Sequence, residues 1–319
     1  MPALNPGDFH IDAILSGMLE GYRPTDMIAD GIFPVINVNK QSNIYAKVNR
    51  GNWFRNPTTL RAPGTAPREV SYTVSSDTYK AENHELATVV AFETIDNADD
   101  PWNPMVLNGQ FLIDQLMLGY EIRTYDTIIG GVGSSMSRTG TDAWDDYGNS
   151  SPLEDMDVAR EAIRRNTQKR PNVAIMGEKA WIKVKRHPDL LKAAIPGGLG
   201  GGVLNEQQMA GLIGVDKFLI GRLIKNTAEE GAADTFTDVW STNLIMAHVA
   251  PAPGIMVPSF GYAFRWTGPN IGARGPGSFA VETRRDTKRK VVEMQTGYYQ
   301  DEKISAAELG FLINTGITE

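Results

Sequence analysis

The sequence of 319 residues contains no cysteine. This absence excludes disulfides, thiolate metal sites and cysteine nucleophiles, and it fits a reducing compartment. Histidine is scarce: only four are present, and no two lie at the spacing of metal ligands on one helix. A zinc protease and a zinc finger are therefore excluded. Basic residues number 31 against 38 acidic ones, and the net charge of −7 disfavours a nucleic-acid binder that depends on overall basicity.

A signal peptide and a membrane-spanning run are also missing. Asp8 and Asp12 stand where the basic region of a leader would lie. The most membrane-like stretch, 243–264, is interrupted by three prolines, and a strand followed by a loop fits it better. We expect a soluble globular protein, because 41% of the residues are hydrophobic. The length suggests roughly two domains, or one large domain.

The common catalytic motifs are absent as well. There is no Gly-Lys dipeptide for a Walker A loop and no Gly-x-Ser-x-Gly elbow. The glycine-rich stretch 197–202 misses the dinucleotide-binding pattern, because Val203 stands where the third glycine must be. The aspartates in 145–157 are interpreted as solvated or capping residues rather than cation ligands. We therefore predict a protein that is not an enzyme, with no catalytic residue, cofactor or metal site.

Charge is unevenly distributed along the chain. No acidic residue lies between Asp30 and Glu69, a segment whose basic residues are Lys40, Lys47, Arg50, Arg55, Arg61 and Arg68. The stretch from Glu93 to Asp157 is acidic, with only Arg123 and Arg138 as opposing charges. Two such segments can pair within the chain or between copies, or they can form two solvated faces that never meet.

The first third of the chain is predicted to be an arm followed by a hairpin. Periodic apolar residues indicate a short helix within 8–20 and an extended stretch at 32–38. Val70, Tyr72 and Val74 alternate with small polar residues, which predicts a strand, and 86–92 is a second β-prone run. The basic, proline-rich stretch 56–67 between the strand-like flanks has no apolar period and indicates a long projecting loop.

Trp53 and Phe54 lie beside the tip of this loop. Large aromatic residues at such a place either form local core or bury against a partner. A partner is the favoured interpretation, because the tip offers little to pack on.

A long helix is predicted next. Apolar residues recur at three- and four-residue steps across 103–129, Asp99-Asp100-Pro101 is interpreted as the helix start, and Gly130-Gly131 as its end. A helix of this length spans roughly 40 Å at ~1.5 Å per residue. Such length is typical of a structural spine rather than of a compact enzyme domain.

The remainder mixes helices and strands without a regular alternation, which favours an α+β fold. Ser151-Pro152-Leu153-Glu154 is interpreted as a capping box that opens a helix to about residue 168. Residues 229–238 are interpreted as polar loop, and 306–313 fits either strand or helix. Further helices are predicted at 178–185, 187–194 and 206–213, and strands at 173–176, 217–220, 244–249, 262–267, 279–283 and 291–299.

One dense basic run lies near the C-terminus. Its basic side chains could contact nucleic-acid phosphates or form salt bridges between subunits, or they could belong to a solvated strand. These alternatives stay open. The run consists of Arg284, Arg285, Lys288, Arg289 and Lys290.

The order of these parts resembles the major capsid (coat) protein of tailed phages, which has the Hong Kong 97-type fold. Phe111 through Tyr125, with Glu121 inside, is similar to the spine helix of that family. The family's extended loop resembles Arg61-Ala62-Pro63-Gly64, Val70-Ser71-Tyr72 and Tyr79-Lys80. Its axial domain resembles Asn172-Val173-Ala174-Ile175-Met176-Gly177, Ala180-Trp181, His187-Pro188-Asp189-Leu190, Val239-Trp240, Pro258-Ser259-Phe260-Gly261-Tyr262 and Phe264-Arg265-Trp266.

The resemblance implies an α+β fold in five parts. These are an N-terminal arm (1–43), an extended β-hairpin loop (44–92), a peripheral domain with the spine helix (93–150), an axial domain (151–280) and a C-terminal return to the peripheral domain (281–319). The extended loop would lie over a neighbouring subunit, so that the basic hairpin meets the acidic region between copies. The expected interface residues are Trp53, Phe54, Arg55, Arg61, Arg68, Asp96, Asp99 and Asp100.

The implied function is self-assembly, through pentamers and hexamers, into the icosahedral shell that encloses the double-stranded DNA genome of a tailed phage. An encapsulin-like cargo compartment is the alternative, and a soluble enzyme with an unrecognised site is a third. Expected partners are further copies, a scaffolding protein, a portal, a decoration protein and packaged DNA held without sequence specificity, but no membrane. The expected location is the virion, after assembly in the host cytoplasm. No fused scaffolding domain is recognised before the arm, and no pair of residues is identified for a Lys–Asn cross-link.

Overall fold

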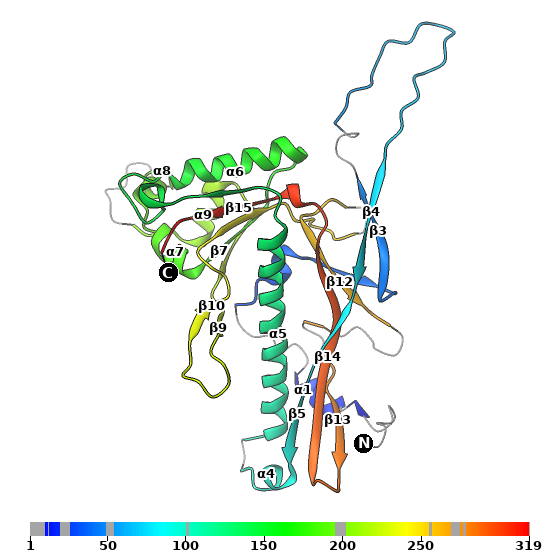
Figure 1. Cartoon of the computed structure of the whole chain (residues 1–319), viewed down its shortest axis with the longest axis vertical. Coiled ribbons are helices and arrows are strands. Elements are labelled where there is room, and N and C mark those ends of the chain that lie inside the picture. The colour runs from blue at the N-terminus through cyan, green and yellow to red at the C-terminus, as the bar shows by residue number, and fades with distance from the viewer. Residues whose placement is uncertain are drawn as a thin grey trace.

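The computed structural model describes residues 10–11, 13–19, 26–48, 54–99, 102–194, 202–254, 257–268, 275–276 and 279–318. Figure 1 shows an elongated molecule with the helix α5 (Pro104–Gly131) along its long axis. A long sheet flanks this helix, a second sheet covered by helices lies at one end, and a hairpin loop projects beyond that end.

The sheet beside α5 has six strands. Its order is β1 (His10–Ile11), β13 (Glu282–Asp286), β14 (Val291–Ile304), β12 (Gly261–Trp266) and β2 (Val35–Val38), with β5 (Glu82–Ala91) pairing the other edge of β14. Every pair is antiparallel except β12 with β2. The long strand β14 alternates buried and half-buried residues, as a strand with one face on a helix should.

Packing between α5 and this sheet forms one hydrophobic cluster. Leu112, Ile113, Leu116 and Met117 of α5 meet the inner face of β14. At the end of the helix, Gly131 lies where the side chain of Ile304 leaves no room for a Cβ atom. The predicted long helix over 103–129 is thus confirmed, with its end at Gly131.

The start of α5 differs from the prediction. The cap is Asn103, whose Oδ1 accepts hydrogen bonds from the N–H groups of Met105 (3.1 Å) and Val106 (3.3 Å), and Pro104 fills the first helical position. The predicted helix start was Asp99-Asp100-Pro101. Asp99 precedes the helix, and residues 100–101 lie outside the described residues. The Asn103-Pro104 pair starts the helix, because the Asn103 side chain reaches two of the free amides. A short helix, α4 (Phe92–Asp96), precedes this turn.

The second sheet has five strands and packs against four helices. Its order is β6 (Ser135–Ser137), β15 (Gly310–Asn314), β11 (Leu244–Ala247), β7 (Val173–Gly177) and β8 (Lys217–Gly221). β7 and β11 are buried throughout, so they form the centre of this core. The helices are α6 (Pro152–Thr167), α7 (Glu178–Val184), α8 (Pro188–Ala194) and α9 (Glu206–Ile213).

These helices lie within a few residues of their predicted positions. The predicted capping box is wrong, because the Ser151 side chain makes no capping hydrogen bond; only its carbonyl accepts, from Asp155 N–H at 3.3 Å. The ambiguous stretch 306–313 resolves into a short 3₁₀ turn, Ala307–Leu309, followed by β15. Another 3₁₀ turn, Gly140–Asp142, lies between β6 and α6.

Two hairpins form two-stranded sheets of their own. β3 (Ser42–Val48) and β4 (Val74–Lys80) form the base of the projecting loop, and their ladder ends at the Val48–Val74 pair. The predicted strand around Val70 is therefore wrong before Val74, because residues 70–73 lie beyond the ladder. The second hairpin, β9 (Ile224–Asn226) with β10 (Phe236–Asp238), was missed, since 236–238 was assigned to loop.

Two strands lie in a different sheet from the one that their place in the sequence predicted. β12 falls in the segment expected to be axial but pairs with the C-terminal half of β14. β15 falls in the expected C-terminal return, yet it pairs with β11 and β6 in the five-stranded sheet. In the expected arm, α1 (Ala13–Leu19) and α2 (Ala29–Ile32) both contribute buried residues to the core beside α5. This part of the segment is thus packed rather than free.

Candidate subunit-interface surfaces

The projecting loop, residues 54–73, exposes both apolar and basic side chains. Leu60 is fully exposed and Phe54 is 44% exposed, while Trp53 lies outside the described residues. The predicted interface residues Arg55, Arg61 and Arg68 are all exposed. Exposed apolar groups in a charged surround are typical of a surface that a partner covers.

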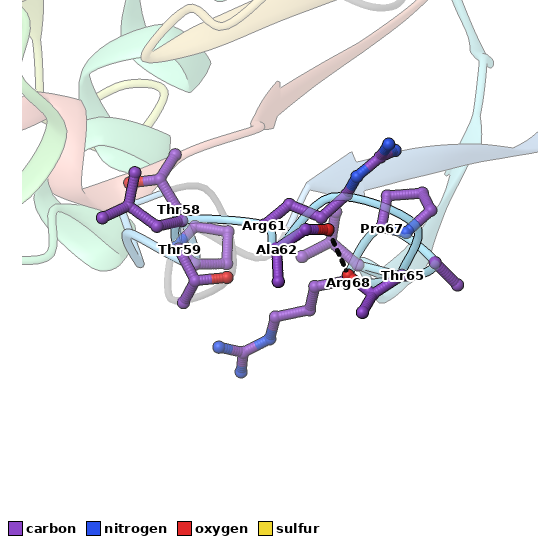
Figure 2. A pocket seen from close by; sticks show the side chains of 11 residues that line it. Thr58, Thr59, Arg61, Ala62, Thr65, Pro67 and Arg68 are labelled. Carbon is purple, nitrogen blue, oxygen red and sulfur yellow. Dashed lines mark hydrogen bonds between the residues drawn. The ribbon is translucent and has the colours of Figure 1, made fainter.

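The loop curls back on itself near its tip. Figure 2 shows a hollow lined by eleven residues between Pro57 and Val70, with a volume of about 420 Å³. The N–H and hydroxyl of Thr65 both donate to the carbonyl of Ala62, at 3.2 and 2.8 Å, and Gly64 between them has φ +81°. The hollow is built by the loop alone, so it is a contour of the projecting surface and has no walls from the body of the molecule.

The base of the loop is firmly attached to the six-stranded sheet. The rings of Tyr45 and Tyr79 lie 5.2 and 4.6 Å from that of Phe264 on β12. The N–H of Lys80 donates to Asp301 at 2.8 Å. Within the hairpin, Lys47 forms an ion pair with Asp77 at 2.6 Å, and this contact holds the pKa of Asp77 below its usual value. The loop therefore has a fixed direction and an exposed tip.

An acidic surface lies at the opposite end of the long axis (Figure 1). There Asp96 ends α4, Asp99 follows it, and both side chains are exposed; Asp100 lies outside the described residues. Leu107 and Phe111 stand one turn apart on α5 and are 44% and 57% exposed. This end of the molecule thus combines acidic and apolar groups with the nearby basic turn between β13 and β14, because the N–H of Phe92 at the start of α4 donates to the carbonyl of Lys290.

The basic run 284–290 covers the end of β13 and the turn that leads into β14. Asp286 organises this turn, because its Oδ1 accepts from the N–H groups of Lys288 (2.9 Å) and Arg289 (3.0 Å). Arg289 also pairs with Glu293 at 2.9 Å. The side chains of Arg285, Lys288, Arg289 and Lys290 are exposed, whereas Arg284 is half-buried.

A small hairpin adds a surface that the sequence prediction missed. Ile224 of β9 and Phe236 of β10 are 54% and 62% exposed. The register pairs Phe236 with Asn226 and Ile224 with Asp238, which places both apolar side chains on one face. The side chain of Asn226 holds the hairpin by accepting from Ala228 N–H and Thr235 N–H, at 3.1 and 3.0 Å. Two features of the sequence could have indicated this hairpin. Asn226 is a residue type that favours turns, and Phe236-Thr237-Asp238 alternates apolar and polar residues as a short strand does.

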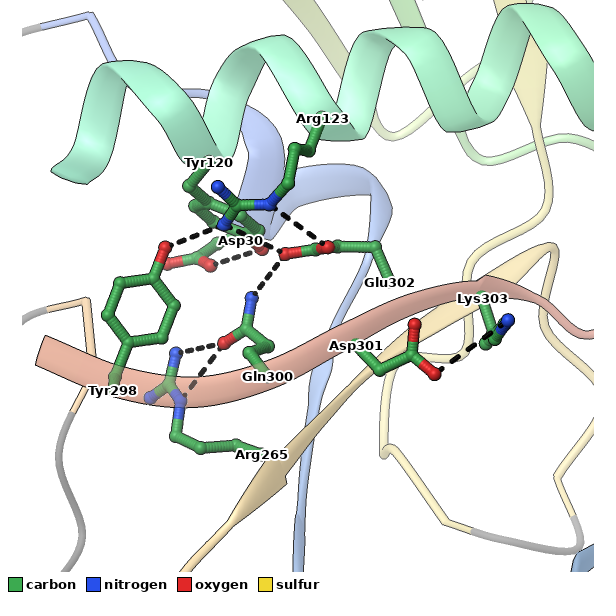
Figure 3. Close-up of polar contacts among 9 residues, drawn as sticks. All are labelled: Asp30, Tyr120, Arg123, Arg265, Tyr298, Gln300, Asp301, Glu302 and Lys303. Carbon is green, nitrogen blue, oxygen red and sulfur yellow. Dashed lines mark hydrogen bonds and ion pairs between the residues drawn. The ribbon is translucent and has the colours of Figure 1, made fainter. Parts of the chain in front are cut away.

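The two arginines of the acidic stretch form contacts inside the chain. Figure 3 shows Arg123 donating to the hydroxyl of Tyr298 at 2.8 Å and to Glu302 at 3.5 Å. Arg265 reaches the same network through Gln300, at 3.1 and 3.0 Å. Burial is the main cause that raises the pKa of Tyr298 to about 12. Arg138 pairs with Asp155 of α6, so both arginines of the stretch serve the subunit's own packing.

One serine–histidine pair has the wrong polarity for catalysis. Ser150 Oγ and His187 Nε2 lie 3.0 Å apart in the buried interior. Nδ1 of His187 accepts from the N–H of Asp189 at 3.2 Å, so Nε2 carries the proton and donates to the serine. Ser150 in turn donates to the carbonyl of Asp146 at 2.6 Å. A histidine in this tautomer cannot take the serine proton, and the pair is a structural contact.

Among the described residues, no three histidine or acidic side chains cluster in a way that could hold a metal ion. None of the helices in the described ranges is both long and apolar enough to cross a membrane.

Two phage proteins are similar to this chain over almost its whole length. No family model matches the chain. The major capsid protein of Pseudomonas phage JBD67 is 26% identical over 312 residues, which cover 93% of this chain and 98% of the relative. The chain is a homologue of phage major capsid proteins. The major capsid protein of Burkholderia phage BcepMu is 22% identical over 320 residues, covering 95% and 96% of the two chains.

Solved structures show the fold of this capsid homologue. A phage-related protein from Bordetella bronchiseptica superposes with a TM-score of 0.71 at 22% identity, over 96% of this chain and 97% of the other. The capsid of cyanophage P-SCSP1u gives 0.60 at 10% identity, over 92% and 89%. A virus-like particle from Pyrococcus furiosus gives 0.53 at 11% identity, over 95% and 97%. The predicted Hong Kong 97-type fold is confirmed.

Proposed function

We propose that the chain is the major capsid protein of a tailed phage, and that it self-assembles into an icosahedral shell around double-stranded DNA. The observation that carries this proposal is the likeness to the Pseudomonas phage major capsid protein, which extends over 98% of that protein. The proposed role is structural, and the names of both sequence relatives support it.

The arrangement of charge supports head-to-tail association of copies. The basic loop tip and the acidic end with Asp96 and Asp99 lie at opposite ends of the long axis. Two different complementary surfaces on one subunit form a heterologous contact, which closes into rings when the rotation permits. Pentamers and hexamers are rings of this kind, in which Phe54, Arg55, Arg61 and Arg68 of one copy lie on the acidic end of the next.

We propose the peripheral and axial domains by their sheets rather than by residue bounds, because β12 and β15 each lie in the other sheet from the one their place in the sequence suggested. The six-stranded sheet with α5 forms the peripheral domain, and the five-stranded sheet with its four helices forms the axial domain at the centre of a ring. A scaffolding protein, a portal and a decoration protein complete the set of proposed partners. The proposed location is the virion, after assembly in the bacterial cytoplasm.

A cargo compartment is the second candidate, because an encapsulin complex from Synechococcus elongatus shares the fold at a TM-score of 0.52. The sequence relatives favour the phage shell, since both are phage proteins. Negative-stain microscopy and light scattering of the purified protein test the proposal, and rings or closed shells are expected. A monodisperse monomer at all concentrations and salts would refute it. A neighbouring cargo-enzyme gene in place of portal and terminase genes would favour the compartment.

A further inference from the structure

The hairpin of β9 and β10 projects from the body of the subunit on a firmly held base. The N–H of Val239 donates to the carbonyl of Leu223 at 2.9 Å, which closes the base. Lys179 of α7 forms an ion pair with Asp238 of β10 at 3.2 Å. Val239 and Trp240, which follow β10, are buried in the core. These contacts fix the direction in which the hairpin points.

Arg222 holds the other strand of this base. Its Nε contacts Glu178 at the start of α7 at 3.0 Å, and its Nη2 contacts Glu206 at the start of α9 at 2.8 Å. Leu223, next along the chain, is half-buried against the core. A projection that is held in place before binding loses little conformational entropy when a partner covers it.

One face of the hairpin exposes large apolar side chains. Ile224 and Phe236 share this apolar face, and they are 54% and 62% exposed. A two-stranded hairpin is only marginally stable by itself in water, so apolar groups that stay in solvent contribute little to its stability. Apolar groups that lie together on a surface with charge around them are typical of an interaction site. The apolar face therefore indicates a partner.

The tip of the hairpin is acidic. Residues 224–238 contain four acidic residues and a single basic one, Lys225. Glu229, Glu230 and Asp234 form this acidic tip, and all three are exposed. The register places Lys225 on the face opposite the apolar one. A partner that fits the hairpin therefore brings positive charge together with apolar side chains.

The projecting loop of a second copy supplies both. Its residues 54–68 include three arginines and no acidic residue, and Leu60 in their middle is fully exposed. The basic turn 284–290, in contrast, contains no apolar residue. Within one subunit the loop and the hairpin point towards opposite ends of the long axis (Figure 1). The two surfaces therefore meet between copies rather than within one.

We propose that the β9–β10 hairpin of one copy binds the projecting loop of a second copy, with Leu60 on the apolar face and the loop arginines at the acidic tip. The proposal rests on the proposed function, because it requires copies that associate. It adds a second acceptor to the acidic end with Asp96 and Asp99, towards which the hairpin points (Figure 1). The two surfaces in contact differ, so the contact is heterologous and can repeat from copy to copy around a ring.

Cross-linking tests the contact directly, because the chain has no cysteine of its own. A chain that carries both Leu60→Cys and Phe236→Cys is assembled and treated with a bismaleimide, whose spacer tolerates a looser geometry than a disulfide. A ladder of covalent dimers and higher oligomers is expected on a denaturing gel, and neither single variant should extend beyond a dimer. The matched control pairs Leu60→Cys with Lys225→Cys on the opposite face of the hairpin, and its ladder should be several-fold weaker.

An exchange of charge gives a second readout. Glu229→Lys with Glu230→Lys places like charges at the contact, so the yield of shells should fall several-fold. Adding Arg61→Glu with Arg68→Glu to this variant restores opposite charges there and should recover part of the yield. Circular dichroism checks that each variant is folded, and sedimentation measures the yield.

The control for net charge is Asp142→Lys with Asp145→Lys, which changes two exposed residues outside the hairpin and should assemble like the wild type. Wild-type shells in which the cysteine pair gives no ladder, or no more than the Lys225→Cys control, would overturn the docking and leave the proposed function standing. Hairpin charge variants with wild-type yield would do the same. A wild-type protein that stays monomeric would contradict the proposed function itself, and the docking with it.

Discussion

The backbone N–H of Phe92 donates to the carbonyl of Lys290 at 3.0 Å. This bond ties the start of α4 to the turn between β13 and β14, although the two lie almost two hundred residues apart. Acidic Asp96 and the basic turn thus share one end of the molecule, where the sequence places them in separate segments. Asp96 at this end can therefore meet the basic loop of one neighbour, while the basic turn can meet an acidic or anionic surface of another molecule.

The first prediction concerns the charge of the projecting loop. Reversing Arg55, Arg61 and Arg68 to Glu should lower shell yield while leaving folding intact, because like charges would then face the acidic end of the neighbour. Each exposed pair contributes only ~0.2–1 kcal/mol, but the contact repeats in every subunit. Sedimentation of assembled shells measures the yield, and circular dichroism checks the fold.

A matched triple charge reversal at another surface tests whether the loss of shell yield depends on the position of the reversed charges or only on the change in net charge. Lys169, Lys192 and Lys217 are exposed on the helical end of the molecule, and their reversal to Glu should leave shell yield near that of the wild type. Adding Asp96→Lys and Asp99→Lys to the loop variant should restore part of the yield. If the loop variant assembles as well as the wild type, the loop does not meet an acidic surface.

The second prediction separates the base of the loop from its tip. Phe264→Leu removes the ring that stacks on Tyr79 at 4.6 Å and should lower the free energy of unfolding by about 1–2 kcal/mol. Leu60→Ala at the fully exposed tip should change it by less than ~0.5 kcal/mol, yet reduce assembly. Urea unfolding and shell yield are measured for both. A Leu60→Ala protein that assembles normally would show that the tip side chain is not an anchor.

The third prediction concerns acid stability at His187. Burial lowers the pKa of this histidine below its usual value, so the unfolded chain binds a proton more readily than the folded one. Stability should therefore fall as the pH drops below about 6.5. His187→Gln keeps a donor for Ser150 but cannot titrate, so its stability should fall less between pH 7 and pH 5. An equal fall in both proteins, measured by urea unfolding, would assign the acid sensitivity to other groups.

The fourth prediction concerns DNA. A net charge of −7 and a basic turn of few residues allow only a small number of phosphate contacts, so the free subunit should bind DNA weakly and with strong salt dependence. Replacing Arg285, Lys288 and Lys290 by Ala should reduce the remaining binding and flatten its salt dependence. Sub-micromolar, sequence-specific binding at physiological salt would contradict a container wall.

Sequence alone predicted the elements whose signal is local. The long helix over 103–129 follows from apolar periodicity within one segment. The predicted helices that correspond to α6 to α9 also lie within a few residues of their expected positions. The basic character of the projecting loop was likewise visible, because charge is written in order along the chain.

Only the tertiary structure decided which distant segments meet. The pairing of β12 with β14 and the place of β15 in the other sheet depend on partners that no local pattern names. Glu121 is the clearest case, since in the sequence it is one of three acidic residues on the long helix. Burial against Ile28, Ala29 and Trp240 alone makes it a junction, because the cost of a buried charge depends on what the rest of the chain places around it.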